Sequence, residues 1–253
     1  MQFLTNRSGA RTASSSSVVL HKPTVDYHKY SETYSYNQKT ILRETVLDVI
    51  SSHNIQSMLD IGAGWTETAL VYKNAVKDYV AVEQDDEIAE LLEKEGLVVI
   101  NESFPCTVED KFELVLSSHS IPEQVEAYET FLQTAWKSTN KQGYLMIITF
   151  KGANDTLVGL SNELIPERAF QKEDGRFEEM MRILQSFGDP VISTVTSCRK
   201  TKAPEDIAHS ISWAFRLDYD QWKDRLLSVL ESRFKDEHGY FFSHEHLVLL
   251  LKK

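Results

Sequence analysis

Apolar and polar residues follow one another along the chain in blocks that predict strands and helices in alternation. Short, continuous apolar runs predict buried strands over residues 57–61, 79–83, 97–101, 112–117 and 143–150. Apolar residues at helical spacing predict helices over residues 36–51, 66–72, 85–94 and 122–136. Apolar strands separated by amphipathic helices are typical of a parallel sheet covered on both faces. We therefore expect a doubly wound α/β fold with right-handed crossovers.

The second half of the chain departs from this rhythm. It predicts a helix over 176–187, a strand over 190–199, a mostly helical segment over 204–233 and a last strand over 246–251. We expect a mostly parallel, seven-stranded sheet with a helical insertion before the last strand. The expected organisation is a flexible tail over 1–25, a core with an N-terminal helical lid over 26–199, a helical cap over 200–243 and a final core strand over 244–253.

The composition of the chain limits the classes of partner molecule and the cellular environment that we expect for it. The net charge is −11, so the average field of the protein repels polyanions and counts against nucleic acid as the main ligand. No apolar run approaches the roughly 20 residues that span a bilayer, so we expect no membrane segment. Cys106 and Cys198 predict free thiols in a reducing cytoplasm. The basic, serine-rich residues 1–25 suit a disordered tail, and they also suit a transit peptide.

A glycine-rich turn after the first predicted strand carries the clearest chemical signal. Leu59-Asp60-Ile61-Gly62-Ala63-Gly64 closes that strand and leads into a helix. Glycines there let the backbone approach a ligand closely, and the amino terminus of the helix faces that ligand. Glu83 ends the next strand, 19 residues after Gly64, near the spacing at which an acid reaches ribose hydroxyls. This unit predicts binding of an adenine nucleoside.

Two acids discriminate between classes of adenine cofactor. A dinucleotide fingerprint requires glycine or alanine where Glu67 stands, and this carboxylate would oppose a pyrophosphate. Asp60 would be equally unfavourable beside phosphates. An acid at this position suits a cationic amino-acid group instead.

On these residues the sequence resembles the class I S-adenosylmethionine-dependent methyltransferases. The resemblance covers about residues 36–150 and is carried by residues 59–64, 82–83, 100–103 and 112–119. It implies S-adenosylmethionine as the cofactor and methyl transfer as the activity. Thr66 stands where many members of the family have a third glycine, which leaves the path of the loop open.

The resemblance also assigns cofactor contacts to residues at the ends of the strands. It places Asp60 beside the methionine amino group and Glu83 on both ribose hydroxyls. The other contacts that it implies are Gly62, Ala63 and Gly64 along the cofactor, Gln84 beside the adenine, Glu102 and Ser103 at the adenine amine, and Ser117 beside the methyl group.

The acceptor class follows from a second resemblance and from missing signatures. Residues 29–34, the long insertion and His119 are similar to the histamine N-methyltransferase-like group of small-molecule enzymes, although histamine itself does not follow. Ser117-Ser118-His119-Ser120 stands where methylases of bases and glutamine carry an Asn/Asp-Pro-Pro-Tyr/Phe loop. The acidic hairpin of protein arginine methyltransferases and the clustered carboxylates of catechol enzymes are absent from the sequence. We expect a small-molecule acceptor, methylated on nitrogen or oxygen.

Four residues are candidates for contact with this acceptor. His119 follows the fourth strand, where a neutral imidazole orients the acceptor, removes its proton or only shapes the pocket wall. Tyr34 and Tyr36 belong to a tyrosine-rich segment whose aromatic faces attract a cation if they fold over the cofactor. Trp213, in the insertion, lines the acceptor pocket or belongs to a core.

Other interpretations remain open. His244-Glu245-His246 lacks the helical spacing and the third ligand of a zinc site, so we expect no metal. A cofactor-binding protein without catalysis, or a protein or peptide methyltransferase, would carry the same motif. The sequence does not decide the oligomeric state.

Overall fold

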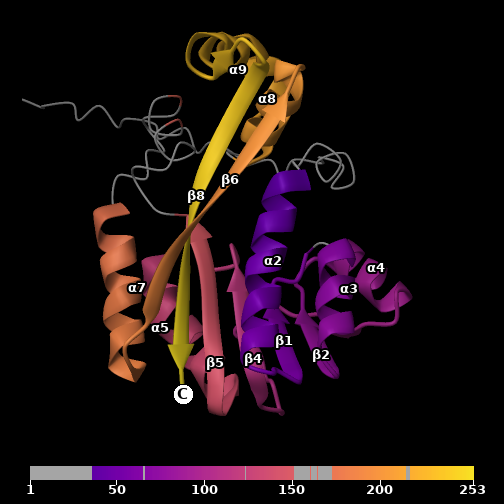
Figure 1. The fold of residues 1–253 in the computed structure, drawn as a ribbon, viewed down its shortest axis with the longest axis vertical. Coiled ribbons are helices and arrows are strands. Elements are labelled where there is room, and N and C mark those ends of the chain that lie inside the picture. Colours follow the sequence, from indigo (N-terminus) through magenta and orange to yellow (C-terminus); the bar gives the residue numbers. More distant parts are fainter. Residues whose placement is uncertain are drawn as a thin grey trace, which may run out of the picture.

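One central sheet organises the protein (Figure 1). The computed structural model describes residues 36–64, 66–122, 124–150, 160, 164, 173–214 and 217–253. Its helices are α2 (Tyr36–Ser52), α3 (Thr66–Ala75), α4 (Asp86–Lys94), η1 (Val125–Ala127), α5 (Tyr128–Ser138), α7 (Glu173–Phe187), α8 (Pro204–Ala214) and α9 (Tyr219–Arg233). Its strands are β1 (Ser57–Ile61), β2 (Asp78–Val82), β3 (Val98–Ile100), β4 (Phe112–Ser118), β5 (Thr139–Phe150), β6 (Val191–Thr201), β7 (Lys235–Asp236) and β8 (Gly239–Lys252).

The order of strands confirms the expected mostly parallel, doubly wound sheet. Seven strands follow the order β3-β2-β1-β4-β5-β8-β6, and the two-residue β7 pairs with β8 as an eighth. The first five strands are mutually parallel, whereas β8 runs antiparallel to β5 and β6. The chain moves outward from β1 to β3 and then returns to β4, so its order reverses between β1 and β4. Open α/β sheets bind their ligands at the carboxyl ends of the strands beside such a reversal.

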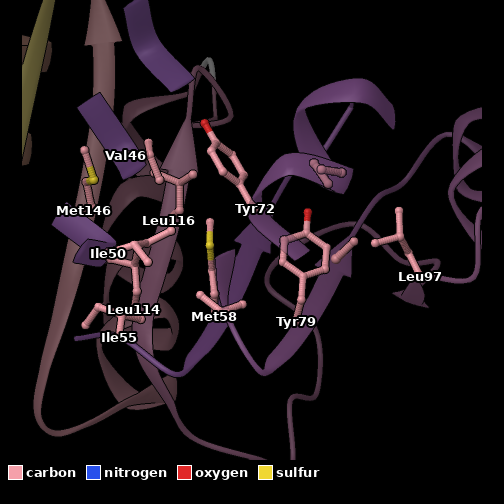
Figure 2. Close-up of a cluster of buried hydrophobic side chains, with 14 of the residues drawn as sticks. Val46, Ile50, Ile55, Met58, Tyr72, Tyr79, Leu97, Leu114, Leu116 and Met146 are labelled. Carbon is pink, nitrogen blue, oxygen red and sulfur yellow. The ribbon is translucent and has the colours of Figure 1, made fainter. Parts of the chain in front are cut away.

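Helices cover both faces of the sheet, as the uniformly apolar strands predict. On one face, Val46 and Ile50 of α2 pack against Met58, Leu114 and Met146 of the sheet (Figure 2). On the other face, α5 and α7 contribute a second cluster, in which Phe131, Leu132 and Leu184 pack with Leu145 and Ile147. Burial on both sides explains why these strands carry so few polar residues.

Several predicted boundaries differ from the structure: β5 begins at Thr139 rather than at residue 143, and two other elements begin still further from where they were expected. The helix expected over 122–136 begins at Tyr128, after the short turn η1, so Pro122 lies outside it. The last strand, expected over 246–251, begins at Gly239. It is longer because β6 and β8 remain paired from Val191↔Leu250 to Thr201↔Tyr240. Polar residues at 243–246 interrupt the apolar run and concealed this extension in the sequence.

The paired strands β6 and β8 extend past the sheet as a ribbon that carries α8 and α9 (Figure 1). These two helices lie beyond the end of the sheet toward which the parallel strands point (Figure 1). They have their own apolar cluster, which includes Ile207, Ile211, Leu226, Leu230 and Phe242. Among the described residues, no helix is both long and apolar enough to cross a membrane.

Candidate functional site

The glycine turn after β1 is built from two residues that hold positive φ angles. Gly62 has φ 70° and Gly64 has φ 57°, a region that side chains disfavour. The N–H groups of Gly62 and Ala63 donate to the Val82 carbonyl at 2.8 and 3.3 Å, which ties the turn to β2. A Cβ atom on Gly62 would lie 2.2 Å from Ser120 Oγ. The turn after β1 and the turn after β4 are therefore in direct contact, and only glycine fits between them.

Glu83 stands at the end of β2 with both carboxylate oxygens fixed by backbone donors. Gly64 N–H donates to Oε2 and Asp85 N–H donates to Oε1, each at 3.0 Å. The side chain is buried, with 7% of its surface exposed. A carboxylate offers about four lone-pair positions, so each oxygen retains capacity for another donor. Two such oxygens, held side by side next to the glycine turn, can accept hydrogen bonds from two neighbouring hydroxyl groups.

Asp60 is buried within β1, beneath the glycine turn. Its Oδ2 accepts a 2.8 Å hydrogen bond from the Tyr79 hydroxyl of β2. Burial raises the pKa of this carboxyl to about 7; the Tyr79 hydrogen bond opposes the rise, and the nearby Glu83 carboxylate adds to it. A cation at this place would favour the ionised form.

The remaining predicted cofactor residues differ in exposure. Gln84, after β2, and Glu102 and Ser103, after β3, are exposed at the same edge of the sheet. Ser117 is fully buried in β4, and its hydroxyl has no hydrogen-bond partner among the described residues. It pairs in register with Ile61 of β1, next to the glycine turn.

His119 belongs to a cluster of rings on the other side of the reversal. It follows β4 with a positive φ of 56°, and its N–H donates to the Ile148 carbonyl at 2.8 Å. Its ring lies 4.3 Å from that of Phe150, centroid to centroid. Its Nε2 lies 3.0 Å from Nδ1 of His246, whose Nε2 lies 2.7 Å from the Ser197 hydroxyl. A left-handed, non-glycine residue in such a cluster is a feature of functional sites.

The surroundings of His119 keep its imidazole neutral. Removal of water by the surrounding protein lowers its pKa well below the ordinary 6.5, and the neighbouring His246 and His244 lower it further. Part of His119 is nonetheless exposed, and water there moderates the effect. With its pKa lowered, the His119 ring is uncharged at neutral pH.

Three residues of this cluster were missed by the sequence prediction: Phe150, Ser197 and His246. A signal for one of them was present, because residues 244 and 246 share a face if the segment is a strand. In the sequence, His244-Glu245-His246 resembles only a metal motif. No group of three or more histidine, cysteine or acidic residues in the described part of the chain is arranged to hold a metal ion.

Three predicted acceptor contacts fall outside what the structure describes. Tyr34 precedes the first described residue, and the side chains of Tyr36 in α2 and Trp213 in α8 are outside the described set. A separate depression of about 350 Å³, lined by residues such as Leu47, Asn54 and Ala75, lies at the amino end of β1. It is therefore remote from the edge that carries Gly62, Glu83 and His119.

Comparison with known proteins identifies the fold. No protein-family model matches the chain, and no curated protein does. Among solved structures, the N-methyltransferase NodS from Bradyrhizobium japonicum is 10% identical with a TM-score of 0.51, and the match covers 86% of this chain and 98% of NodS. A mycolic acid cyclopropane synthase, complexed with SAH, is 13% identical with a TM-score of 0.50, and the match covers 83% of each chain. The chain shares their fold. A functionally unknown protein from Deinococcus radiodurans has it too, at 13% identity, a TM-score of 0.50, and coverage of 82% and 86%.

Asp60 predicts how stability depends on pH. Because its folded pKa of about 7 exceeds the unfolded value of 3.8, the folded state holds a proton that the unfolded state releases, and the free energy of unfolding falls as pH rises from about 4 through 7. Asp60→Asn removes this loss and should stabilise the protein at pH 8 by on the order of 1–3 kcal/mol, with little gain at pH 4. Urea unfolding at both pH values measures the change, and the exposed Asp48→Asn is the control. Equal effects of the two variants would contradict the raised pKa.

The contact between Gly62 and Ser120 makes a second prediction, with Gly96 as its matched control. Gly96 has φ 78° and open space where a Cβ atom would lie, so Gly96→Ala tests the positive φ alone at roughly 1–2 kcal/mol. Gly62→Ala also places a Cβ atom against Ser120, so in urea unfolding it should lower the free energy of unfolding by clearly more than Gly96→Ala does. Adding Ser120→Gly should return the cost to that of Gly96→Ala. If Ser120→Gly restores none of the stability lost in Gly62→Ala, the two turns are not in contact.

Proposed function

We propose that the protein is an S-adenosylmethionine-dependent methyltransferase that methylates a small molecule on nitrogen or oxygen. The observation that carries the proposal is the Glu83 carboxylate, which the Gly64 and Asp85 N–H groups hold beside the glycine turn. Its place is the carboxyl edge of the sheet, beside the reversal where this fold binds ligands. The fold that the chain shares with the N-methyltransferase NodS supports the same reaction class.

The residues present fit the cofactor. Glu83 offers two oriented acceptors for ribose hydroxyls, and the buried Asp60 offers a carboxylate for the methionine ammonium. Gly62 and Gly64 remove side chains where the cofactor would approach the backbone. Gln84, Glu102 and Ser103 are exposed where an adenine would lie. When bound, S-adenosylmethionine supplies a methyl group on a positively charged sulfur, which needs little further activation.

The chain's own contribution is therefore alignment. An in-line displacement requires the acceptor atom about 3 Å from the methyl carbon, and holding that geometry supplies most of the acceleration. His119, on the far side of the Gly62–Ser120 contact, is placed to orient the acceptor. Because burial keeps His119 neutral, an uncharged acceptor fits beside it more readily than a charged one that brings no hydrogen-bonding partner.

The cofactor assignment predicts a large effect of Glu83→Gln. The substitution replaces one accepting oxygen by an NH₂ group that faces a backbone N–H or a ribose hydroxyl. We expect S-adenosylhomocysteine to bind roughly 10–100-fold more weakly in calorimetry, since a hydrogen bond to a charged group contributes about 1.5–3 kcal/mol. Glu87→Gln, an exposed carboxylate in the first turn of α4, should leave the affinity unchanged. Tight binding of NAD, or equal affinities of both variants, would refute the assignment.

The proposed role of His119 in orienting the acceptor predicts an effect of His119→Asn on turnover. Asparagine tolerates the left-handed conformation at this position, so the turn should persist. Release of S-adenosylhomocysteine is measured over a panel of small amines, phenols and acids. Turnover with the best acceptor should fall by about 10²-fold, because the acceptor loses the side chain that orients it, while cofactor affinity stays near that of the unsubstituted protein. His53→Asn, a histidine stacked on Tyr144, is the control. Turnover of peptides alone, or cofactor binding without any turnover, would favour the two rival functions.

A further inference from the structure

Three polar side chains form one hydrogen-bonded series that runs from the interior of the ribbon to the acceptor side of the site. Ser197 Oγ of β6 lies 2.7 Å from His246 Nε2 of β8, and His246 Nδ1 lies 3.0 Å from His119 Nε2. Ser197 and His246 have no exposed surface, whereas His119 is exposed. The hydrogen-bonded series therefore has a buried end at Ser197 and a solvent-exposed end at His119.

The buried hydroxyl of Ser197 determines which nitrogen of His246 carries hydrogen. A neutral imidazole has one N–H donor and one bare nitrogen that accepts. His246 Nε2 is the one hydrogen-bond partner of the Ser197 hydroxyl among the described residues. If His246 Nε2 carried hydrogen, the buried hydroxyl hydrogen of Ser197 would have no acceptor, which is an unfavourable state for a buried donor. Ser197 therefore donates to a bare His246 Nε2.

The position of the hydrogen on His246 in turn determines the position of the hydrogen on His119. With Nε2 bare, His246 carries its hydrogen on Nδ1 and donates it to His119 Nε2. His119, which stays neutral, must then carry its own hydrogen on Nδ1. The second nitrogen of His119, Nδ1, is therefore a donor, so this ring cannot act as the base that removes a proton from the acceptor.

We propose that His119 offers its Nδ1–H to the methyl acceptor and that the accepting atom is an oxygen anion, a carboxylate or an ionised phenol. The inference rests on the proposed methyltransferase function. An amine nitrogen has a single lone pair, and a donor bound to it would block its attack on the methyl carbon. An oxygen anion has further lone pairs, so one receives the His119 hydrogen bond while another attacks.

The step balances without a base. The oxygen's electron pair forms the new C–O bond as the C–S bond of the methyl donor breaks, and the negative oxygen and the positive sulfur neutralise each other. No proton is released. His246 and Ser197 are positioning residues, since they reach the acceptor only through His119.

The first test needs neither cofactor nor acceptor. In ¹⁵N-histidine NMR of the full chain, a bare imidazole nitrogen resonates far downfield of an N–H nitrogen. We expect His119 and His246 each to show Nδ1–H and a bare Nε2 at pH 7.5. A bare Nδ1 on His119 would overturn the inference, whatever the enzyme does.

Two variants of His246 provide a matched pair for the same test. His246→Asn places an amide where Nδ1 stood, so it still donates to His119 but cannot reach Ser197. His246→Gln places its amide where Nε2 stood, so it keeps Ser197 and leaves His119 Nε2 without a partner. We expect the His119 spectrum to persist in His246→Asn and to change to the Nε2–H form in His246→Gln. Identical spectra in the two variants would contradict the proposed role of His246.

Turnover tests the acceptor class separately. Carboxylates and phenols should be methylated, and His246→Gln should reduce that rate roughly 10–100-fold, the value of a lost donor to an anion, whereas His246→Asn stays within about threefold of the unsubstituted protein. Cofactor affinity should not change in either variant. Turnover of amines in preference to acids would overturn this inference and leave the methyltransferase function intact. Failure to bind S-adenosylhomocysteine would instead refute the proposed function, while the NMR result would stand.

Discussion

The pairing of β1 with β4 is the constraint on which the site depends. These strands run in parallel register from Met58↔Leu114 to Ile61↔Ser117, at the place where the chain order of the sheet reverses. The register brings the turn after β1 against the turn after β4, so closely that a Cβ on Gly62 would collide with Ser120. A glycine at 62 is thus required first by the packing of the protein itself. Any ligand that uses the same turn benefits from a conformation that is already fixed.

The two turns that meet there differ in electrostatic character. On the β1 and β2 side, Asp60 and Glu83 provide carboxylates that are buried, oriented and partly satisfied by Tyr79 and by backbone donors. On the β4 side, burial keeps the His119 imidazole neutral, and its Nε2 lies 3.0 Å from Nδ1 of His246. Under the proposed function, a cationic cofactor lies against the acidic side and its methyl group faces the neutral side. The boundary between them is the Gly62–Ser120 contact.

Features encoded by local pattern could be predicted from the sequence, and features encoded by distant pairing could not. The first five strands follow from apolar runs, and Glu83 follows from its spacing after Gly64. The bond between His119 and His246 joins residues 127 positions apart, and that between Ser197 and His246 joins residues 49 apart. Neither leaves a periodic signal. The polar residues that make these bonds also disguised the full length of β8, because a strand that is polar in its middle has no continuous apolar run.

Strand β8 has three different environments along its length. Near Gly239 it packs with the helical pair α8 and α9, at His246 it contributes a ring to the cluster around His119, and from His246 to Leu250 it is paired with β5 on one side and β6 on the other. One stiff element therefore links a peripheral module to the imidazoles and anchors them at its other end. A substitution in α8 or α9 that shifts β8 would therefore also shift these rings, with no change to any residue of the glycine turn.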